Sequence, residues 1–505
     1  MTTENQRTAS SKSLIVVGAG AAGIKLAHAL LVADSTAFRE ITILEANNYI
    51  GGRVRNFKFE GHTVEMGANW ISGREAAFDN PIWKLAQDIE LQGHPSEREN
   101  PDGMMVLDCT NSNEANNDVT KIYMEQVKRF DNIYDRALAA RKQAEAEGRH
   151  SNANSNTNTS VRQVLEQHGW TPKSELNDVE RAVEHNVLEV WVAESLENLS
   201  AEYDMRPGAN DVELGQDEIF VEDSRGLNSI FDGMVHDLKQ GTNSTRTIIR
   251  MEMEVQSIHY APGNVKVIAK DVKTGTVAEF HGDAVVSTVS IGVLQSNAIA
   301  FVPPLPAWKR AALGEMKMFN FAKVYAKFDC QLWPDNKDYF LFVTKGEGNR
   351  GHYPLWMRYK NAKDNLLMCY LGGAQARRVE TLEEEQLKNE IEDLFFQGFG
   401  GGRSREECRP VAVTTTDWSR NPLFCGSYSY FPKGAFASVP YRNLGRGLTG
   451  VPEGDKETTE NDLRLPTTLY FAGEALDDKY NGWIQGGYLS GERVAMSMLS
   501  SSLSS

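Results

Sequence analysis

The chain has 505 residues, more than one ordinary hydrophobic core accommodates, and this length predicts two or three domains. Hydrophobic residues make up 41% and charged residues 24% of it, a composition typical of a soluble globular protein. The net charge of −16 argues against nucleic acid or an anionic membrane as a partner and favours small cations.

The N-terminal residues and the cysteines bear on the compartment. Residues 1–13 are polar, are predicted to be disordered and lack the apolar segment of a signal peptide. No run approaches the ~18 apolar residues of a transmembrane helix. The five cysteines are scattered without a C-x-x-C pair, which disfavours a disulfide framework and a metal site. We therefore predict a cytoplasmic protein without a metal ion.

The first predicted unit is a strand, a glycine turn and a helix. Residues 14–17 are apolar and rich in β-branched side chains, which indicates a buried parallel strand. Gly18, Gly20 and Gly23 follow as G-x-G-x-x-G, and residues 24–32 favour a helix. Gly18 permits a tight turn, Gly20 lets backbone approach a pyrophosphate, and Gly23 lets the helix pack on the strand. Since the helix N-terminus also attracts phosphates, this unit predicts a dinucleotide site.

A second predicted strand, residues 41–44, ends at Glu45. This carboxylate lies 22 residues after Gly23, near the spacing of about 20 that is usual for a ribose 2′-hydroxyl acceptor. Residues 51–53, Gly-Gly-Arg, then combine close backbone approach with a guanidinium that suits a phosphate. The dinucleotide site is thus predicted to extend beyond the first turn.

The character of the chain changes between residues 75 and 207. Residues 121–147 are strongly charged and predict a helix, and residues 177–200 predict another that carries Trp191. Residues 151–160 are a low-complexity run of Ser, Asn and Thr, which predicts an exposed loop. We interpret this mainly helical block as a separate lobe.

Strands return in the second half of the chain. Residues 247–280 contain β-rich runs separated by Pro-Gly and Thr-Gly turns and predict a β-meander. Residues 284–289 predict a strand that returns to the first sheet. Residues 301–430 alternate predicted strands and helices. A last strand, residues 468–474, ends in Gly-Glu, and residues 481–499 pass through a glycine-rich turn into a helix.

Taken together, the motifs resemble those of the flavin-containing amine oxidases, most closely the polyamine oxidases. The matching segments are, in chain order, residues 14–23, 45–46, 51–53, 64–70, 287–296, 303–309, 472–474 and 480–491. The first three are similar to the family's FAD-binding start, and the last two to its C-terminal flavin fingerprint. The resemblance extends over residues 14–499.

The resemblance implies an α/β fold of two domains, with helices and a mixed sheet segregated as in α+β proteins. A discontinuous Rossmann-like FAD-binding domain would comprise residues 14–80, 208–300 and 430–505, and a substrate-binding domain residues 81–207 and 301–429. FAD is the implied cofactor. No cysteine lies in the C-terminal fingerprint, so we expect FAD to be held non-covalently.

The residues expected to bind FAD come from both ends of the chain. They are Gly18, Gly20, Ala22, Gly23, Glu45, Ala46, Gly52, Arg53, Gly67, Ala68, Asn69, Trp70, Val255, Thr288, Trp418, Gly473, Glu474, Gly482, Trp483 and Ile484. By resemblance, Glu474 binds near the ribityl and phosphate groups. The helix after it presents its N-terminus to the flavin, which suits the negative charge of a reduced ring.

Lys323 is the candidate catalytic residue, because it matches the family lysine that holds a water near flavin N5. Residues 322–328 alternate with a period of two, and Lys323 shares one strand face with Lys327. A lysine opposite an apolar face is ordinarily solvated, so the strand alone favours a plain surface charge. The resemblance favours the functional role.

The substrate-binding candidates also rest on the resemblance. Glu65 matches a family carboxylate near the amine tunnel, where it would orient a cationic amine. Phe321, Tyr428 and Trp483 match aromatic residues that flank the flavin and sandwich an extended aliphatic amine. A second family carboxylate, on a helix of the substrate lobe, falls near Trp191 here, so the chain departs from the pattern at that point.

The implied activity is FAD-dependent oxidation of a C–N bond of spermine or spermidine, with hydride transfer to flavin N5. Dioxygen is the implied acceptor, giving H2O2, an aldehyde and an amine. The expected partners are this small amine and O2, in a monomer or weak oligomer, without nucleic acid or membrane. Another amine oxidase or an L-amino-acid oxidase, with Arg358 as carboxylate ligand, stays open. So does a non-catalytic flavin-binding protein.

Overall fold

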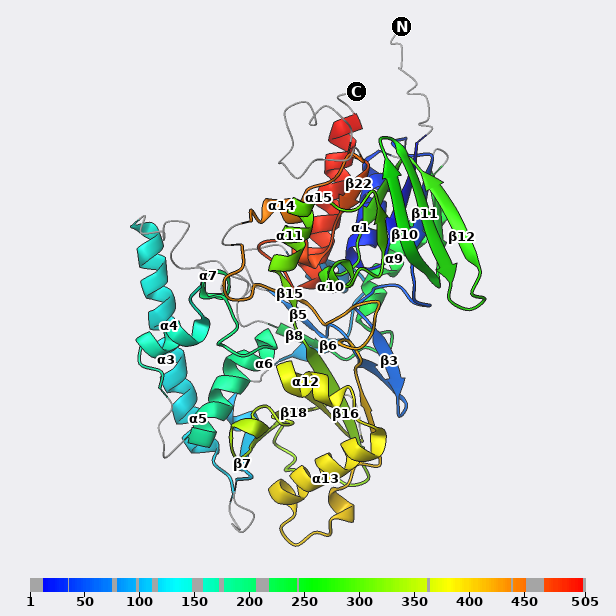
Figure 1. Ribbon diagram of the computed structural model, residues 1–505. Coiled ribbons are helices and arrows are strands. Elements are labelled where there is room, and N and C mark those ends of the chain that lie inside the picture. Colours follow the sequence, from blue (N-terminus) through cyan, green and yellow to red (C-terminus); the bar gives the residue numbers. More distant parts are fainter. Residues whose placement is uncertain are drawn as a thin grey trace.

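A computed structural model describes residues 12–34, 36–74, 80–96, 100–110, 117–147, 158–171, 177–205, 218–242, 245–360, 364–436, 439–450 and 467–502. The chain has a two-domain α/β fold, with one body built on a parallel sheet and the other on a mixed sheet with helices (Figure 1). The predicted disorder of residues 1–11 and most of the predicted loop at 151–160 lie outside the described residues, whereas Ser13 begins the first strand.

The first body contains a five-stranded sheet in the order β22-β13-β1-β2-β9, in which all neighbours are parallel. Its strands are β1 (Ser13–Val17), β2 (Glu40–Leu44), β9 (Arg246–Arg250), β13 (Ala284–Ser287) and β22 (Leu469–Phe471). The predicted strands at 14–17, 41–44 and 284–289 are confirmed. Segments from the start, middle and end of the chain therefore share one sheet.

Different layers cover the two faces of this sheet, because successive β1 side chains point to opposite faces. Leu14 and Val16 pack with helices α1 and α15, whereas Ile15 and Val17 pack with the predicted β-meander. Figure 1 shows α15 lying along α1. The elements of these layers are α1 (Ala21–Ala33), α15 (Ile484–Ser502), β10 (Met253–Ala261), β11 (Asn264–Asp271), β12 (Val277–Gly282) and β14 (Ala300–Val302).

The second body is built on a six-stranded mixed sheet in the order β20-β16-β19-β18-β17-β7. Its strands are β7 (Met104–Asp108), β16 (Phe321–Phe328), β17 (Tyr339–Val343), β18 (Leu355–Arg358), β19 (Asn365–Gly372) and β20 (Ala412–Thr415). The period of two in β16 puts Tyr325 into the core with the helical lobe, and Ala322 and Val324 into the opposite core. Both faces of this sheet are therefore covered.

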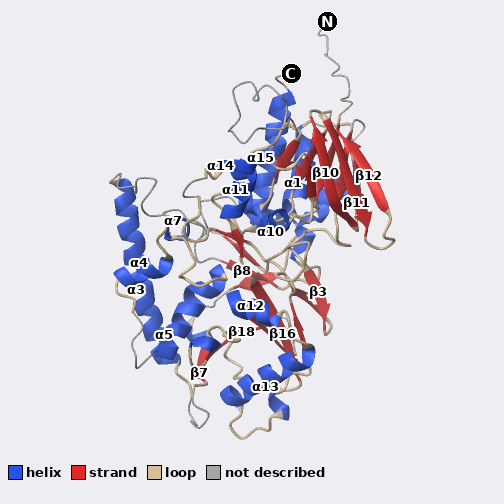
Figure 2. Ribbon diagram, viewed as in Figure 1, coloured by secondary structure: helices blue, strands red, loops and turns tan. Residues whose placement is uncertain are grey.

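Helices surround the mixed sheet (Figure 2). On one side are α3 (Thr120–Ala146), α4 (Val161–Gln167), α5 (Asn177–Glu184), a π-helix (His185–Glu189) and α6 (Val190–Val192). On the other side are α12 (Gly373–Val379) and α13 (Glu384–Phe399). The predicted helix at 121–147 is confirmed. The one predicted at 177–200 is confirmed only to Val192, because Ala193 is left-handed and ends it, and it contains a π turn that no pattern of the sequence indicates.

The remaining elements are short. They are β3 (Asn56–Phe59), β4 (His62–Glu65), β5 (Trp70–Ser72), α2 (Pro81–Asp88), β6 (Gly93–Pro95), α7 (Ala201–Asp204), β8 (Glu218–Val221), α9 (Asp232–Gln240), α10 (Ile291–Ser296), α11 (Ala307–Glu315), β15 (Lys317–Met318), β21 (Ser429–Tyr430) and α14 (Arg442–Gly445). In the described residues no helix is long and apolar enough to span a membrane.

Two segments that we assigned to the substrate-binding domain pack with the first body. Ile82 and Ala86 of α2 belong to the core around α1 and α15. Trp308 and Leu313 of α11 belong to the core around the β-meander. The chain therefore leaves the first body only after each helix, because each buries its apolar face against the parallel-sheet body. The predicted boundary at residue 81 lies before the end of α2, and the one at residue 301 lies before α11.

The contact between α1 and α15 leaves no room for a side chain at Gly491. A Cβ added there would lie 2.2 Å from the Ala22 carbonyl oxygen. We expect Gly491→Ala to separate the two helices, lower the thermal midpoint and reduce FAD retention. Flavin absorbance at ~450 nm per protein after gel filtration measures that retention.

Gly314, in α11, is the matched control, because a Cβ there would meet nothing within 4 Å. Removing a helical glycine at an open position should leave stability unchanged or raise it by about 0.5–1 kcal/mol. Equal losses of flavin in Gly314→Ala and Gly491→Ala would contradict the packing explanation.

Candidate active site

A cavity of about 1200 Å³ extends from the parallel sheet into the helical lobe. It is lined by the residues predicted for cofactor and substrate, with the exceptions of Gly23 and Glu65. Gly18, Glu45 and Thr288 each come directly after a strand of the parallel sheet, and Gly473 follows β22 after one further residue. The cavity therefore opens at the carboxyl edge of that sheet, where open α/β sheets bind their ligands.

The glycines of the first turn have different structural roles. A Cβ on Gly23 would lie 2.1 Å from the Gly18 carbonyl oxygen, so Gly23 serves helix packing and does not line the cavity. A Cβ on Gly20 would meet no protein atom closer than 4.0 Å. Gly20 also precedes α1 without a side-chain cap. The missing side chain leaves open space at a helix N-terminus, the geometry in which a phosphate binds.

Glu45 is fixed at the end of β2 by main-chain donors. Its Oε2 accepts the Ala19 N–H at 2.7 Å, and its Oε1 accepts the Asn47 N–H at 2.8 Å. The side chain is 5% exposed and lines the cavity. This position, one strand away from the glycine turn, is that of the ribose acceptor in dinucleotide-binding folds.

Glu474 joins the two ends of the chain at the cavity. One carboxylate oxygen accepts Arg53 Nη1 at 2.8 Å, and the other accepts the Gly482 N–H at 2.7 Å and the Ser429 hydroxyl at 2.5 Å. Arg53 lines the cavity beside it. An arginine that is already neutralised by a carboxylate orients donors without leaving an excess positive charge.

Two glycines near the C-terminus leave open space beside the cavity, as Gly20 does. A Cβ on Gly473 would come no closer than 4.0 Å to another group, and one on Gly487 no closer than 3.8 Å. With Gly20 they form an elongated cradle that runs past Arg53 and suits the length of FAD. No group of three or more His, Cys, Asp or Glu among the described residues could hold a metal ion.

Lys323 is buried, although a lysine on a strand is usually solvated. Its side chain is 1% exposed, and Nζ donates to the carbonyl oxygens of Glu65 at 2.8 Å and Gly67 at 2.6 Å and to Asn69 Oδ1 at 2.9 Å. Burial lowers the pKa of Lys323, and the charge of Glu65 opposes that shift. The ammonium group therefore reaches the cavity wall with its donors directed to one turn of the chain.

That turn is further fixed by Trp418. The indole N–H of Trp418 donates to the Met66 carbonyl at 2.9 Å. The buried carboxylate of Glu380 accepts the main-chain N–H groups of Trp418 and Ser419, both at 2.9 Å. The turn after β4 is thus held from both sides. Trp418 presents its ring to the cavity as a result.

Aromatic rings line the cavity beyond Lys323. Nζ of Lys323 lies 5.3 Å from the centre of the Trp70 ring, which meets the Trp191 ring edge-on at 6.0 Å. The centres of the Phe321 and Tyr428 rings are 6.1 Å apart, and the Tyr428 hydroxyl donates to the Trp191 carbonyl at 2.6 Å. Phe321, Tyr428 and Trp191 are therefore brought together, and Trp483 lines the same cavity. With Trp70 they form a largely apolar passage.

The structure places Glu65 behind this passage and not in its lining. The side chain is 2% exposed, and Oε1 accepts the Leu227 N–H at 2.6 Å. Burial raises the pKa of Glu65, whereas the Leu227 N–H and the charge of Lys323 lower it. The carboxylate thus joins β4 to the residues after β8.

Two groups of cavity residues escape prediction from the sequence. One is a face of α3 with Tyr123, Val127, Tyr134 and Leu138. Their spacing of four and seven residues marks one helix face, but the many intervening charges hide it. The other is Asn186 in the π-helix, for which the sequence carries no signal.

Comparison with known proteins agrees with this geometry. The nucleotide cradle at the carboxyl edge of the sheet defines a flavoprotein of the dinucleotide-binding class. A family profile for flavin containing amine oxidoreductases matches residues 21–499. The chain therefore belongs to this family and is an FAD-dependent amine oxidoreductase.

The relatives extend over most of the chain. Polyamine oxidase 1 of Zea mays is 28% identical over 493 residues, which cover 95% of this chain and 88% of the relative. Lysine-specific histone demethylase 1 homolog 2 of Arabidopsis thaliana is 27% identical over 503 residues, but only 58% of its length is covered.

Solved structures share the fold. A redesigned double mutant of putrescine oxidase superposes with a TM-score of 0.65 at 16% identity, covering 97% of this chain and 99% of the other. Cyclohexylamine oxidase from Brevibacterium oxydans gives a TM-score of 0.65 at 17% identity, with the same coverage of both chains.

The substitution Glu65→Gln distinguishes two possible roles of Glu65, that of a substrate ligand and that of a buried acceptor that stabilises the fold. The amide oxygen of Gln can still accept the Leu227 N–H, but its charge is gone. We expect KM for the amine to stay within about twofold, whereas Glu65→Leu leaves that N–H unsatisfied and destabilises the fold by about 1–3 kcal/mol. Steady-state kinetics and urea unfolding measure the two effects. A rise in KM of about tenfold in Glu65→Gln would instead favour the predicted contact with a cationic amine.

Lys323 makes stability depend on pH. Because burial lowers its pKa below the unfolded value of 10.5, the unfolded chain binds the proton more tightly. Stability is therefore full above that unfolded pKa and falls as pH drops toward the folded pKa. Between about pH 10 and 8, we expect the thermal midpoint of wild type to fall relative to Lys323→Met.

Lys327→Met is the control for this pH dependence, since Asp364 raises the pKa of Lys327 and keeps it charged in that range. Identical pH profiles of wild type and Lys323→Met would contradict the assignment.

Proposed function

We propose that the protein is a polyamine oxidase that oxidises a C–N bond of spermine or spermidine. The observation that carries this proposal is one cavity that joins a nucleotide cradle to an aromatic passage, with the buried Lys323 at their junction. When bound, FAD supplies the acceptor for the hydride that leaves the carbon next to nitrogen, and O2 takes the electrons to give H2O2. Hydrolysis of the resulting imine yields an aldehyde and an amine.

The chain contributes binding, orientation and exclusion of water. Phe321 and Tyr428 hold the aliphatic chain. Lys323 fixes the turn after β4 at the cavity wall, because its three donors are used there. Glu45, Arg53 and Glu474 orient the cofactor from both ends of the chain. No cysteine is among the described residues that line the cavity, which supports non-covalent FAD. A cytoplasmic monomer or weak oligomer stays a prediction.

The balance of charges at the helical lobe favours an amine without a carboxylate. Asp131, Asp135 and Asp204 line this part of the cavity, whereas Lys128 is the cation among the described residues that line it. An L-amino-acid oxidase would instead need a cation for the substrate carboxylate. Arg358 does not supply it, because its Nη1 donates to the Asp335 carbonyl at 2.9 Å and the residue is not part of the cavity lining. Arg53 lines the cavity but is paired with Glu474.

The proposal is tested with purified protein that has retained or been loaded with FAD. Spermine or spermidine added without oxygen should bleach the flavin band at ~450 nm, and with oxygen should give stoichiometric H2O2. Because the reacting amine must be neutral, kcat/KM should rise between about pH 7 and 9. Mass spectrometry of the products identifies the bond that is broken. A flavin band unchanged by either amine would favour a non-catalytic flavin-binding protein.

Lys323→Met tests the catalytic assignment within the same assay. We expect flavin reduction or reoxidation to slow by at least about tenfold while FAD stays bound, because a positioned group is lost. Stopped-flow absorbance measures each half-reaction. Lys327→Met, on the same strand, should leave both rates unchanged. Unchanged half-reactions in Lys323→Met would remove its role.

A further inference from the structure

Glu380 is a buried carboxylate that lies outside the cavity lining. It directly follows α12, at the point where this helix packs beside β16 (Figure 1). The residue is 5% exposed. Burying a carboxylate is costly unless donors occupy both of its oxygens, so the groups bound to Glu380 are held in fixed positions.

Four uncharged donors from the segment after β20 occupy these two oxygens. Oε1 accepts the Thr416 hydroxyl at 3.0 Å and the Trp418 N–H at 2.9 Å. Oε2 accepts the Ser419 N–H at 2.9 Å and also the Ser419 hydroxyl. The carboxylate therefore fixes residues 416–419 as one turn.

One side of this turn leads to the main chain of Lys323. The Thr416 hydroxyl oxygen accepts the Lys323 N–H at 3.2 Å, and the Thr416 N–H donates to the Lys323 carbonyl at 3.1 Å. Nζ of Lys323 in turn donates to the carbonyls of Glu65 and Gly67, in the turn after β4. Glu380 thus reaches the turn after β4 through Thr416 and Lys323.

The other side of the 416–419 turn leads back to the same place. The indole N–H of Trp418 donates to the Met66 carbonyl at 2.9 Å, and Met66 lies between the two residues whose carbonyls accept Nζ of Lys323. The hydrogen bonds therefore form a closed ring, which contains Lys323 and Trp418 and which Glu380 completes. Both Lys323 and Trp418 line the cavity, so a change in the ring moves two groups of the cavity wall together.

We propose that Glu380 is a positioning residue for amine oxidation, which sets Lys323 and Trp418 relative to each other at the cavity wall. This inference rests on the role of Lys323 in the proposed polyamine oxidase function. Glu380 acts only through its hydrogen bonds, because it does not reach the cavity. Such a residue affects the rate because a displacement of about 1 Å at a reacting centre can slow a reaction about 100-fold.

The test uses Glu380→Gln, which keeps the shape of the side chain but replaces one accepting oxygen by an NH2 group. We expect the half-reaction that Lys323→Met slows to become about tenfold slower, with KM for spermine within about twofold and FAD retained. Adding Glu380→Gln to Lys323→Met should slow the reaction by less than about twofold further, because both changes act on one ring. Stopped-flow absorbance of the flavin measures each half-reaction.

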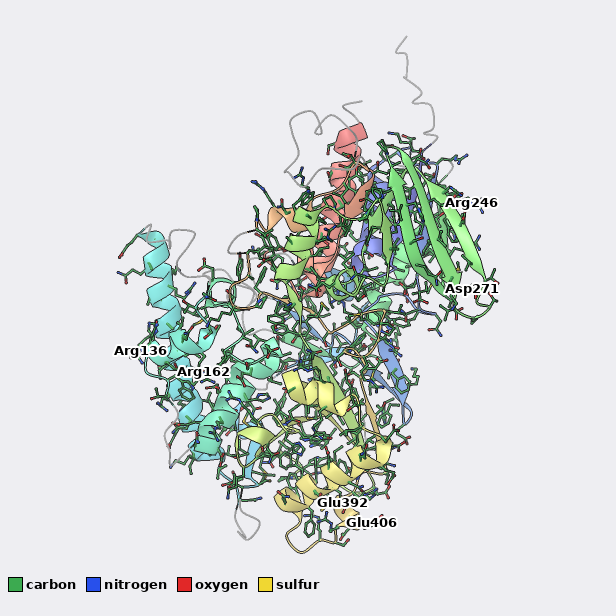
Figure 3. All side chains as sticks on the ribbon, in the orientation of Figure 1. Arg136, Arg162, Arg246, Asp271, Glu392 and Glu406 are labelled. Carbon is green, nitrogen blue, oxygen red and sulfur yellow. The ribbon has the colours of Figure 1, made fainter. Side chains whose placement is uncertain are left out.

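Glu392→Gln is the matched control in the same body. Glu392 lies on α13, at the end of the second body that is remote from the parallel sheet (Figure 3). It accepts Arg405 Nε at 2.8 Å and Arg409 Nη1 at 2.7 Å and is not part of the cavity lining. Its loss removes hydrogen bonds to a carboxylate without touching the ring, so both half-reactions should stay unchanged.

Thr416→Val removes one hydroxyl of the ring and keeps the carboxylate, so it should slow the same half-reaction if Glu380→Gln does not fold. Unchanged half-reactions in the folded variants, equal slowing in Glu392→Gln, or rate losses that multiply in the double variant would overturn the proposal.

Thermal unfolding separates the proposal from the proposed function, because it needs no turnover. The thermal midpoint of the double variant Glu380→Gln/Lys323→Met should fall by less than the sum of the two single shifts. If no amine reduces the flavin of wild type, this result would keep the coupling of Glu380 to Lys323 and reject the oxidase. Shifts that add up would overturn the positioning role as well.

Discussion

The structure depends on one buried carboxylate that closes the chain on itself. Glu474 accepts hydrogen bonds from Ser429, from Gly482 and from Arg53, which lies 421 residues earlier in the sequence. A buried carboxylate is stable only when its oxygens are paired, so these segments must meet for any of them to be satisfied. Because α15 packs on α1 over the same turn, the cofactor cradle and the fold of the first body are completed together.

Lys323 shows how the second body depends on the first. An ammonium group on a strand with both faces covered is costly unless all of its donors are used. Nζ finds three acceptors on the turn after β4, a segment of the parallel-sheet body. The lysine therefore fixes the two bodies against each other at the cavity. The group assigned to catalysis is also the group that sets the relative position of cofactor and substrate passage.

The passage itself combines rigid aromatic walls with few polar groups. Trp70, Trp191, Phe321 and Tyr428 support one another by ring contacts, so the apolar section is formed before an amine enters. Pre-formed walls reduce the entropy lost on binding a flexible chain. The ion pairs of Arg350 with Glu184 and Glu189 stabilise the π-helix that precedes Trp191.

The sequence by itself determined the glycine turn, four strands of the parallel sheet, most of the β-meander and the family, because these depend on local spacing and on motifs that a nucleotide demands. It was wrong for β9, which we assigned to the meander and which pairs with β2 in the parallel sheet. It also identified Lys323 and the aromatic residues, although only through resemblance. Tertiary structure alone decided that Lys323 is buried, that Glu65 faces Leu227 and that α2 and α11 pack with the first body. It also decided the π turn at His185–Glu189. These features arise from packing between segments distant in sequence, which no local pattern records.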